Sequence, residues 1–274
     1  MFDLGKLHFA PDAGKYRTDN ALICALLSAL SYKREAIIRT TLRDNGFRHV
    51  HYFTHEKVDT QCLIASKDKT LFAVFRGTQV FEMKDWNTNR KVLMVGGPLG
   101  KIHRGFLLAL TSVWAEVSDC IDTLLKKHPD KSLWLTGHSL GGALATIACA
   151  YRIDENLPIG GVYTFGQPRV GDGSFSRNLN RTIQDRFFRV ANHRDIVTRL
   201  PPRVFGYDHA GQICYFDKNQ KLHLSVDAWN IFLNQMRGII DGYLTKRIPL
   251  GTITDHSIGQ YVRVIRKNRP SPRA

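Results

Sequence analysis

The 274-residue chain lacks an apolar run long enough to cross a bilayer. No stretch approaches the roughly 18 uninterrupted apolar residues that a membrane span needs. Residues 1–17 contain no apolar segment of the kind found in secretory signals. The longest early apolar run, Ala21 to Leu30, follows Asp19-Asn20 and is typical of a capped, buried helix. We therefore expect a cytoplasmic protein, or one at the periphery of a membrane.

Cysteine is scarce and scattered, since the chain has five, an odd number, and no two form a C-x-x-C pair. Cys24, Cys62, Cys149 and Cys214 lie in apolar surroundings. This usage indicates free buried thiols in a reducing compartment rather than a disulfide framework or a zinc site. We expect neither a metal nor a cofactor.

Acidic residues are also few, with 24 Asp and Glu against 39 Lys and Arg, a formal net charge of +15. A basic surface attracts polyanions. The charge is spread over residues 33–48, 186–203 and 263–273, however, and no nucleic-acid-binding motif accompanies it. We predict a solvated basic surface with weak attraction to anionic membranes, and no nucleic-acid partner.

The composition, 43% hydrophobic and 23% charged, is that of an ordinary globular protein. We predict one domain over residues 1–265 and a basic, Pro-bearing tail over 266–274. Apolar periodicity predicts helices over residues 19–32, 107–127 and 225–245. It predicts strands over residues 50–53, 61–66, 70–75, 133–136, 159–166, 187–191 and 207–216.

One stretch carries a reactive-site pattern. Leu133 to Thr136 is typical of a strand, Gly137-His138-Ser139-Leu140-Gly141 follows at once, and Ala143 to Ala150 continues as a buried helix. A strand, a sharp turn and a helix are the context in which G-x-S-x-G presents a nucleophilic serine. The motif alone is weak, because Ser139 also suits an ordinary turn. The interpretation needs an oxyanion donor, an acid and a histidine elsewhere.

Candidates for these partners follow in a suitable order. Thr78 comes just after the apolar run 70–75, so its backbone N–H and that of Leu140 suit an oxyanion hole. Asp195 follows the strand 187–191 and precedes His256, which we place on a loop late in the chain. Rival acids are Asp172, Asp185 and Asp208, and alternative histidines are His103, His138, His193, His209 and His223.

Two further segments have both an ordinary and a functional interpretation. Residues 81–95, which include Trp86, suit either a helix plus loop or a flap over the site. The stripe of apolar residues over 225–245, which includes Trp229, is most often part of a core. It precedes His256, so it also suits a wall or cover of the pocket.

Several separated motifs together resemble the class 3, or fungal-type, triacylglycerol lipase family of α/β-hydrolases. They span about residues 20–265 in the family's order. They are Phe75-Arg76-Gly77-Thr78, Asp85-Trp86, Ile102 to Phe106, Gly137 to Ala145, Tyr163 to Gly171, Asp195-Ile196-Val197 with Leu200-Pro201-Pro202, and Asp255-His256 with Tyr261.

The resemblance implies an α/β-hydrolase fold: a central, mostly parallel sheet flanked by helices, a short lid-like segment near residues 81–95 and a helical insertion before the histidine. It implies Ser139 as nucleophile, Asp195 as acid, His256 as base, and oxyanion N–H groups at Thr78 and Leu140. Trp86, His138 and Trp229 are the expected substrate contacts.

The expected activity is that of a lipase or carboxylesterase on acylglycerols, since the apolar residues of the flap interpretation and the stripe around Trp229 favour an acyl chain over a peptide. A phospholipase or galactolipase is the alternative, suggested by the basic surface. A non-catalytic lipid-binding scaffold on the same fold ranks lower.

Overall fold

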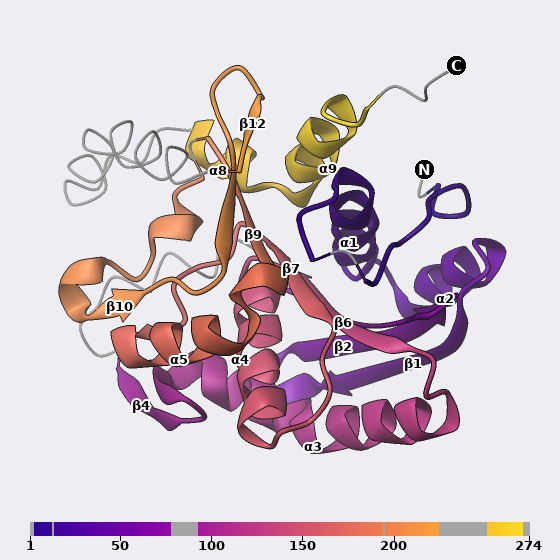
Figure 1. Ribbon diagram of the computed structural model, residues 1–274, viewed down its shortest axis with the longest axis horizontal. Helices are drawn as coiled ribbons and strands as arrows, with labels where there is room; N and C mark the ends of the chain where they lie inside the picture. The colour runs from indigo at the N-terminus through magenta and orange to yellow at the C-terminus, as the bar shows by residue number, and fades with distance from the viewer. Residues whose placement is uncertain (1–2, 13, 78–92, 194, 225–250, 271–274) are drawn as a thin grey trace.

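The computed structural model describes residues 3–12, 14–77, 93–193, 195–224 and 251–270 (Figure 1). Its α-helices are α1 (Thr18–Leu30), α2 (Glu35–Asp44), α3 (Arg104–Lys127), α4 (Leu140–Asp154), α5 (Gly173–Ile183), α8 (Gly251–His256) and α9 (Ile258–Lys267). Its strands are β1 (Arg48–His55), β2 (Thr60–Lys67), β3 (Thr70–Phe75), β4 (Met94–Gly97), β5 (Gly100–His103), β6 (Ser132–His138), β7 (Gly161–Phe165), β8 (Gly171–Asp172), β9 (Phe187–Asn192), β10 (Tyr207–Asp208), β11 (Gln212–Phe216) and β12 (Leu222–His223).

The main sheet has eight described strands in the order β1-β2-β3-β6-β7-β9-β11-β12. The five strands from β3 to β11 run parallel to one another, and antiparallel pairs occur only toward the two edges of this described sheet. The expected central, mostly parallel sheet flanked by helices is confirmed. The carboxyl ends of β6, β7 and β9 therefore lie along one edge, where open α/β sheets bind ligands.

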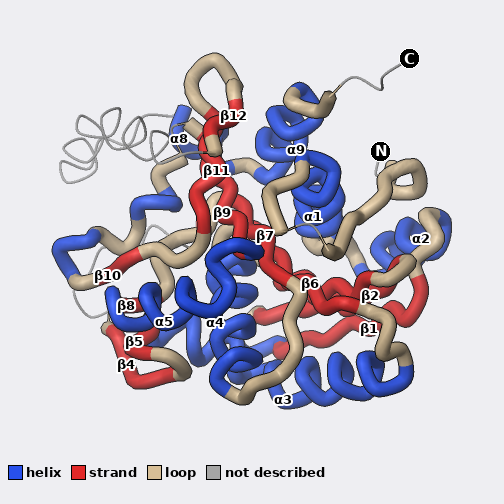
Figure 2. Tube along the Cα trace, in the orientation of Figure 1, coloured by secondary structure: helices blue, strands red, loops and turns tan. Residues whose placement is uncertain are grey.

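Both faces of the sheet are covered by helices, with α3, α4 and α5 on one side and α1, α2 and α9 on the other (Figure 2). Neighbouring residues of a strand contribute to opposite cores. Leu133 and Leu135 of β6 pack with α3 and α4, whereas Trp134 between them packs with α1 and α9. Burial on both faces explains why these strands are continuous apolar runs in the sequence.

A second, four-stranded sheet in the order β10-β8-β5-β4 lies beside the first. It corrects one expectation. The single strand predicted over residues 207–216 is two short strands in different sheets, because the chain turns at Gly211, whose φ is +82°. In the same sheet, β4 and β5 form a hairpin in which Gly97 pairs with Gly100.

The last described helix packs against the first. Tyr261 and Ile265 of α9 share a core with Leu22 and Leu26 of α1. Arg269 also places its Nε 2.7 Å from Oδ1 of Asp19. The start and the end of the described chain therefore close over the same face of the sheet (Figure 1).

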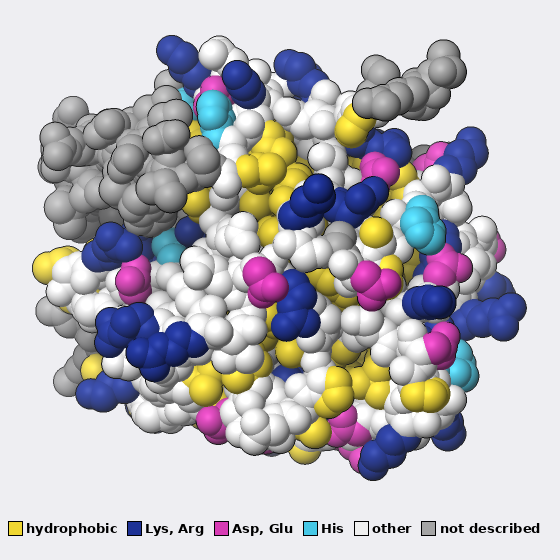
Figure 3. Space-filling view, in the orientation of Figure 1, with side chains coloured by type: hydrophobic (Ala, Val, Ile, Leu, Met, Phe, Trp, Pro, Cys, Tyr) yellow, Lys and Arg dark blue, Asp and Glu magenta, His cyan; other side chains and the backbone are white. Residues whose placement is uncertain are grey.

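The described residues bear on three expectations from the sequence. All five cysteines are free thiols, and Cys24, Cys62, Cys149 and Cys214 are buried. Within the described ranges, no helix combines the length and the apolar character needed to cross a membrane. Lysine and arginine side chains are scattered over the face in Figure 3 rather than gathered into one patch.

Candidate active site

Ser139 occupies the turn between β6 and α4 in a backbone conformation that residues with a side chain rarely adopt, with φ 59° and ψ −127°. A Cβ at position 137 would lie 2.2 Å from the carbonyl oxygen of Gly141, and one at position 141 would lie 2.1 Å from that of Phe75. Both positions therefore require glycine. The tight turn places Ser139 at the carboxyl end of β6.

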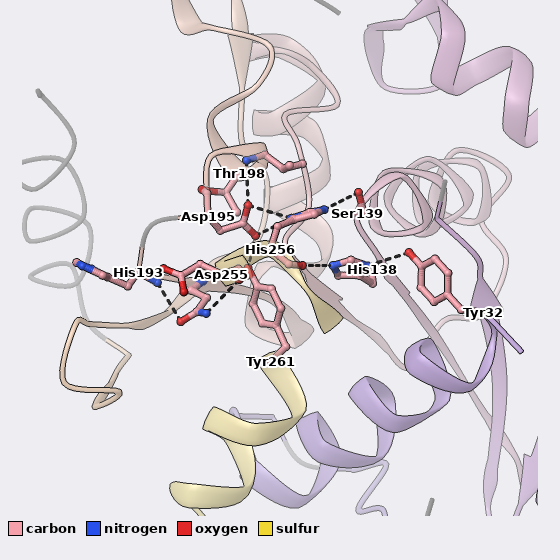
Figure 4. Close-up of polar contacts among 11 residues, drawn as sticks. Tyr32, His138, Ser139, His193, Asp195, Thr198, Asp255, His256 and Tyr261 are labelled. Atoms are coloured by element: carbon pink, nitrogen blue, oxygen red, sulfur yellow. Dashed lines mark hydrogen bonds and ion pairs between the residues drawn. The ribbon is translucent and has the colours of Figure 1, made fainter. Parts of the chain in front are cut away.

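Ser139, His256 and Asp195 form a continuous hydrogen-bonded line (Figure 4). Nε2 of His256 lies 2.8 Å from Oγ of Ser139, and its Nδ1 lies 2.9 Å from each carboxylate oxygen of Asp195. All three residues are fully buried. An ionised carboxylate can only accept, so Nδ1 carries the proton and Nε2 is left to accept the serine proton.

Two different elements bring the acid and the histidine to this serine. Asp195 follows β9, the second strand along from β6 in the sheet. His256 is the last residue of α8, so the expectation that a loop carries it was wrong. The segment is too short and too polar to show the apolar periodicity by which a helix is recognised in a sequence.

The carboxylate of Asp195 has two further donors. The backbone N–H of Val197 donates to Oδ1 over 2.9 Å, and the hydroxyl of Tyr261 donates to Oδ2 over 2.5 Å. A Cβ added at Gly166 would lie 2.7 Å from Oδ2 of Asp195 and 2.9 Å from Nδ1 of His256. These contacts hold the carboxylate in one orientation toward the imidazole.

His138 lies directly behind the site. Its Nδ1 is 2.8 Å from the hydroxyl of Tyr32, and its Nε2 is 2.6 Å from the carbonyl oxygen of His256. Burial lowers its pKa well below the ordinary value, and the neighbouring imidazole of His256 lowers it further. His138 is therefore neutral, with both ring nitrogens engaged inside the protein. Its contact with a substrate stays a prediction.

The rival acids have other surroundings. Asp172 accepts from the N–H of Phe175 at the start of α5, Asp208 pairs with Arg203 and Asp185 pairs with Arg186.

The other histidines are also engaged elsewhere. The side chain of His103 caps α3, and His209 bonds the carbonyl of Thr198. His193 lies 3.3 Å from the hydroxyl of Tyr215, and His223 pairs with Asp217. Of the histidines that we considered, His256 is the one whose ring bonds Ser139.

The expected oxyanion donors are described only in part. Leu140 is the first residue of α4, so its N–H has no partner within the helix and lies beside Ser139. Thr78, Trp86 and Trp229, with most of the expected lid and the helical insertion, lie outside the described residues. Thr78 follows Gly77, where a Cβ would lie 2.5 Å from the carbonyl oxygen of His138. The end of β3 therefore abuts the turn that carries Ser139.

The roles of Tyr32 and Tyr261 were missed from the sequence. Tyr32 follows an apolar helix, and Tyr261 belongs to an apolar stretch, so both suit ordinary core positions. No local pattern shows that they contact His138 and Asp195, which lie 106 and 66 residues away in sequence.

Within the described part of the chain, no group of three or more His, Cys, Asp and Glu side chains is arranged to hold a metal ion.

Comparison with known proteins points in one direction. A family model described as Lipase (class 3) matches residues 72–205. A lipase of Rhizomucor miehei is 36% identical over 208 residues, which cover 72% of this chain and 54% of the relative. A triacylglycerol lipase of Ricinus communis is 29% identical over 258 residues, which cover 71% of this chain and 49% of that protein. The chain thus spans about half the length of these two relatives.

Solved structures match over more of their length. The Rhizomucor miehei triacylglyceride lipase superposes with a TM-score of 0.65 at 29% identity, covering 79% of this chain and 92% of that one. The lipase of a fungal lipase–inhibitor complex superposes with a TM-score of 0.65 at 30% identity, covering 75% of this chain and 82% of the other. With this coverage and the matched family model, the chain belongs to the class 3 lipase family.

Proposed function

We propose that this protein is a serine hydrolase that cleaves acyl esters of glycerolipids. The observation that carries the proposal is the buried line from Ser139 through His256 to Asp195, with distances of 2.8 and 2.9 Å. A serine hydroxyl is a weak nucleophile at neutral pH and needs an adjacent base. The line supplies that base and a carboxylate that orients it.

The mechanism that we propose follows from this geometry. Oγ of Ser139 attacks the ester carbonyl while Nε2 of His256 takes its proton. Asp195 holds the imidazole through Nδ1 and stabilises the imidazolium. His256 then protonates the leaving alcohol, and water hydrolyses the acyl-enzyme by the same path in reverse order.

The N–H groups of Thr78 and Leu140 are the proposed oxyanion donors. A helix N-terminus favours developing negative charge, which supports the role of Leu140 at the start of α4. Removing one such donor typically costs about 3–4 kcal/mol in the transition state. Trp86, His138 and Trp229 remain the proposed substrate contacts.

The substrate class that we propose is acylglycerols. The relatives support it, since their names include triacylglycerol lipases and secreted mono- and diacylglycerol lipases. A phospholipase or galactolipase is the second candidate, because a net charge of +15 favours contact with anionic membrane surfaces.

Five free thiols favour a reducing compartment such as the cytoplasm, although some relatives are secreted. We also propose that residues 1–265 act as one domain, with a basic tail over 266–274.

The test compares wild type with Ser139→Ala on tributyrin, a long-chain triglyceride, phosphatidylglycerol and a galactolipid, alongside labelling by a fluorophosphonate. We expect labelling and acylglycerol turnover in wild type, and neither in the variant. Preferred turnover of phosphatidylglycerol or the galactolipid would move the assignment to the second candidate. A folded wild-type protein that is neither labelled nor active would instead favour a lipid-binding scaffold.

A further inference from the structure

A chain of hydrogen bonds behind the site fixes the direction in which each donor points. The carbonyl oxygen of His256 can only accept, so Nε2 of His138, 2.6 Å away, must donate to it. His138 is neutral, so its Nδ1 must accept, and the hydroxyl of Tyr32, 2.8 Å away, must donate. The structure thereby determines the tautomer of His138.

The phenol of Tyr32 lies against the end of β3. A Cβ at Gly77 would lie 2.4 Å from the phenol oxygen of Tyr32, and the guanidinium of Arg76 lies 5.7 Å from its ring centre. Burial raises the pKa of Tyr32, so the phenol keeps its proton. One line of hydrogen bonds therefore joins Tyr32, the residue before Ser139 and the backbone of His256 (Figure 4).

We propose that Tyr32 and His138 are positioning residues that hold the imidazole of His256 within hydrogen-bonding distance of Oγ of Ser139. This inference rests on the proposed function. Without the Tyr32 hydroxyl, Nδ1 of His138 would be buried with no donor, and the opposite tautomer would become competitive. That tautomer has no proton on Nε2, so the carbonyl of His256 would lose its donor and the backbone that carries the base would loosen.

The test is Tyr32→Phe, with Tyr163→Phe as the matched control. Tyr163 is a buried tyrosine of β7 whose hydroxyl accepts from the N–H of Arg17. For Tyr32→Phe we expect kcat on a soluble ester to fall about tenfold, equivalent to one buried hydrogen bond, with KM little changed. We also expect the downfield proton resonance of the His256–Asp195 bond to shift or broaden. Tyr163→Phe should change neither.

Variants at His138 separate positioning from simple loss of packing. An amide can accept from Tyr32 and donate to the His256 carbonyl, so His138→Gln should retain more kcat than His138→Leu. Equal kcat in Tyr32→Phe and Tyr163→Phe, or no advantage of glutamine over leucine, would overturn this inference alone. An inactive, unlabelled wild type would instead overturn the proposed function.

A second inference comes from a hollow at the opposite edge of the sheet. It measures about 370 Å³, and its ionisable lining residues are Arg48, His49, Lys67, Asp68, His128 and Lys131. Five of these six are basic types, and Asp68 is the one acidic residue among the described residues of the lining. A volume of this size suits a small ligand. Because Ser139 lies at the carboxyl end of β6 and Lys131 precedes its start, about 20 Å of strand separates the hollow from the site.

The basic side chains are held in place. The rings of His49 and His128 lie 4.6 Å apart, and Nδ1 of His49 is 2.8 Å from Oγ of Ser66. Nζ of Lys67 donates to the carbonyl of Leu4 over 2.9 Å, and that of Lys131 donates to the carbonyl of Asp68. Burial lowers the pKa of His49, and His128 and Lys131 lower it further. The neighbouring positive charges thus disfavour protonation of His49, and an anion bound between these groups would relieve that repulsion.

We propose that this hollow binds an anion carrying several phosphate groups, either free in solution or as a lipid headgroup. The test is calorimetric titration with inorganic tripolyphosphate, and sedimentation with phosphatidic acid vesicles against phosphatidylcholine vesicles. The variant Arg48→Gln/Lys131→Gln removes two charges from the hollow. The control, Lys218→Gln/Lys221→Gln, removes two charges from exposed positions beside β12.

The expected result is binding that weakens about tenfold or more in the hollow variant and little in the control, because hydrogen bonds between a cation and a phosphate are stronger than neutral ones. Binding of tripolyphosphate identifies a free phosphate ligand, and binding of phosphatidic acid vesicles alone identifies a headgroup. Equal weakening in both variants would show nonspecific attraction to surface charge and overturn the inference, as would the absence of binding in wild type.

Discussion

The hydroxyl of Tyr261 donates to Oδ2 of Asp195 over 2.5 Å, and both residues are fully buried. The same phenol oxygen accepts from the backbone N–H of Asn192 over 3.1 Å. One tyrosine of α9 thus joins the end of β9 to the carboxylate beside His256. Tyr261 thus orients the carboxylate of Asp195, although it is not one of the three residues that we propose as catalytic.

Removing this hydroxyl is expected to affect activity and stability together. In Tyr261→Phe the carboxylate of Asp195 loses a donor and the N–H of Asn192 loses its acceptor. We expect the free energy of unfolding to fall by about 2–3 kcal/mol, as for a buried hydrogen bond to a charged group. Ester turnover should fall as well. Urea denaturation and a chromogenic ester assay measure the two effects, and an unchanged variant would contradict the assigned bond.

The backbone strain at Ser139 gives a prediction that does not depend on the substrate. At φ 59° and ψ −127°, glycine is the residue that fits without strain. We expect Ser139→Gly to be more stable than Ser139→Ala by about 1 kcal/mol, and both variants to be inactive. Thermal unfolding of the pair measures the difference. A less stable glycine variant would argue against stored strain at this turn.

Glycine is required on either side of that serine. A Cβ at Gly137 or Gly141 would approach backbone atoms within 2.2 Å, so the turn would have to open. We expect Gly137→Ala and Gly141→Ala to lose about 3 kcal/mol or more, or to fail to fold. Gly96→Ala is the control, because a Cβ there meets nothing within 4 Å. Soluble yield and denaturation midpoints of the three variants provide the comparison.

Two buried histidines make stability depend on pH. Burial lowers the pKa of His138 and of His209 well below the ordinary value, with Arg189 and Arg169 adding to the shift at His209. Below about pH 6.5 the unfolded chain binds protons that the folded protein excludes, so stability is lost as pH falls. Each histidine adds a slope of up to about 1.4 kcal/mol per pH unit.

Denaturation at pH 7.5, 6.5 and 5.5 tests this dependence. In His209→Gln, the free energy of unfolding should fall less between pH 7.5 and 5.5, by the contribution of one histidine. His51→Gln, at an exposed position, should leave this fall unchanged. A wild-type protein equally stable at pH 7.5 and 5.5 would show that these rings accept protons without unfolding.

The features that could be predicted from the sequence are those set by residues close together along the chain. The strands β3, β6, β7 and β9 are apolar runs because both faces of the sheet are covered. Ser139 was identified because its turn requires glycine at 137 and 141. Asp195 and His256 were ranked by their order along the chain, and the geometry brings both to Ser139.

The remainder depends on packing between distant segments. The helix that ends at His256 is only six residues long, so it has no apolar period to detect. The strands β10 and β11 are separate because the chain turns at the single residue Gly211. Tyr32 and Tyr261 resemble core residues, and their hydroxyl contacts exist only once α1 and α9 pack on the sheet.

The contact between α1 and α9 links the two extremities of the described chain to the imidazole of His256. His256 is separated from α9 by one residue, and Arg269 beyond that helix is anchored to Asp19 at the start of α1. We therefore expect fraying at either extremity to displace the proposed base before the sheet itself unfolds, so that ester turnover declines ahead of any spectroscopic sign of global unfolding.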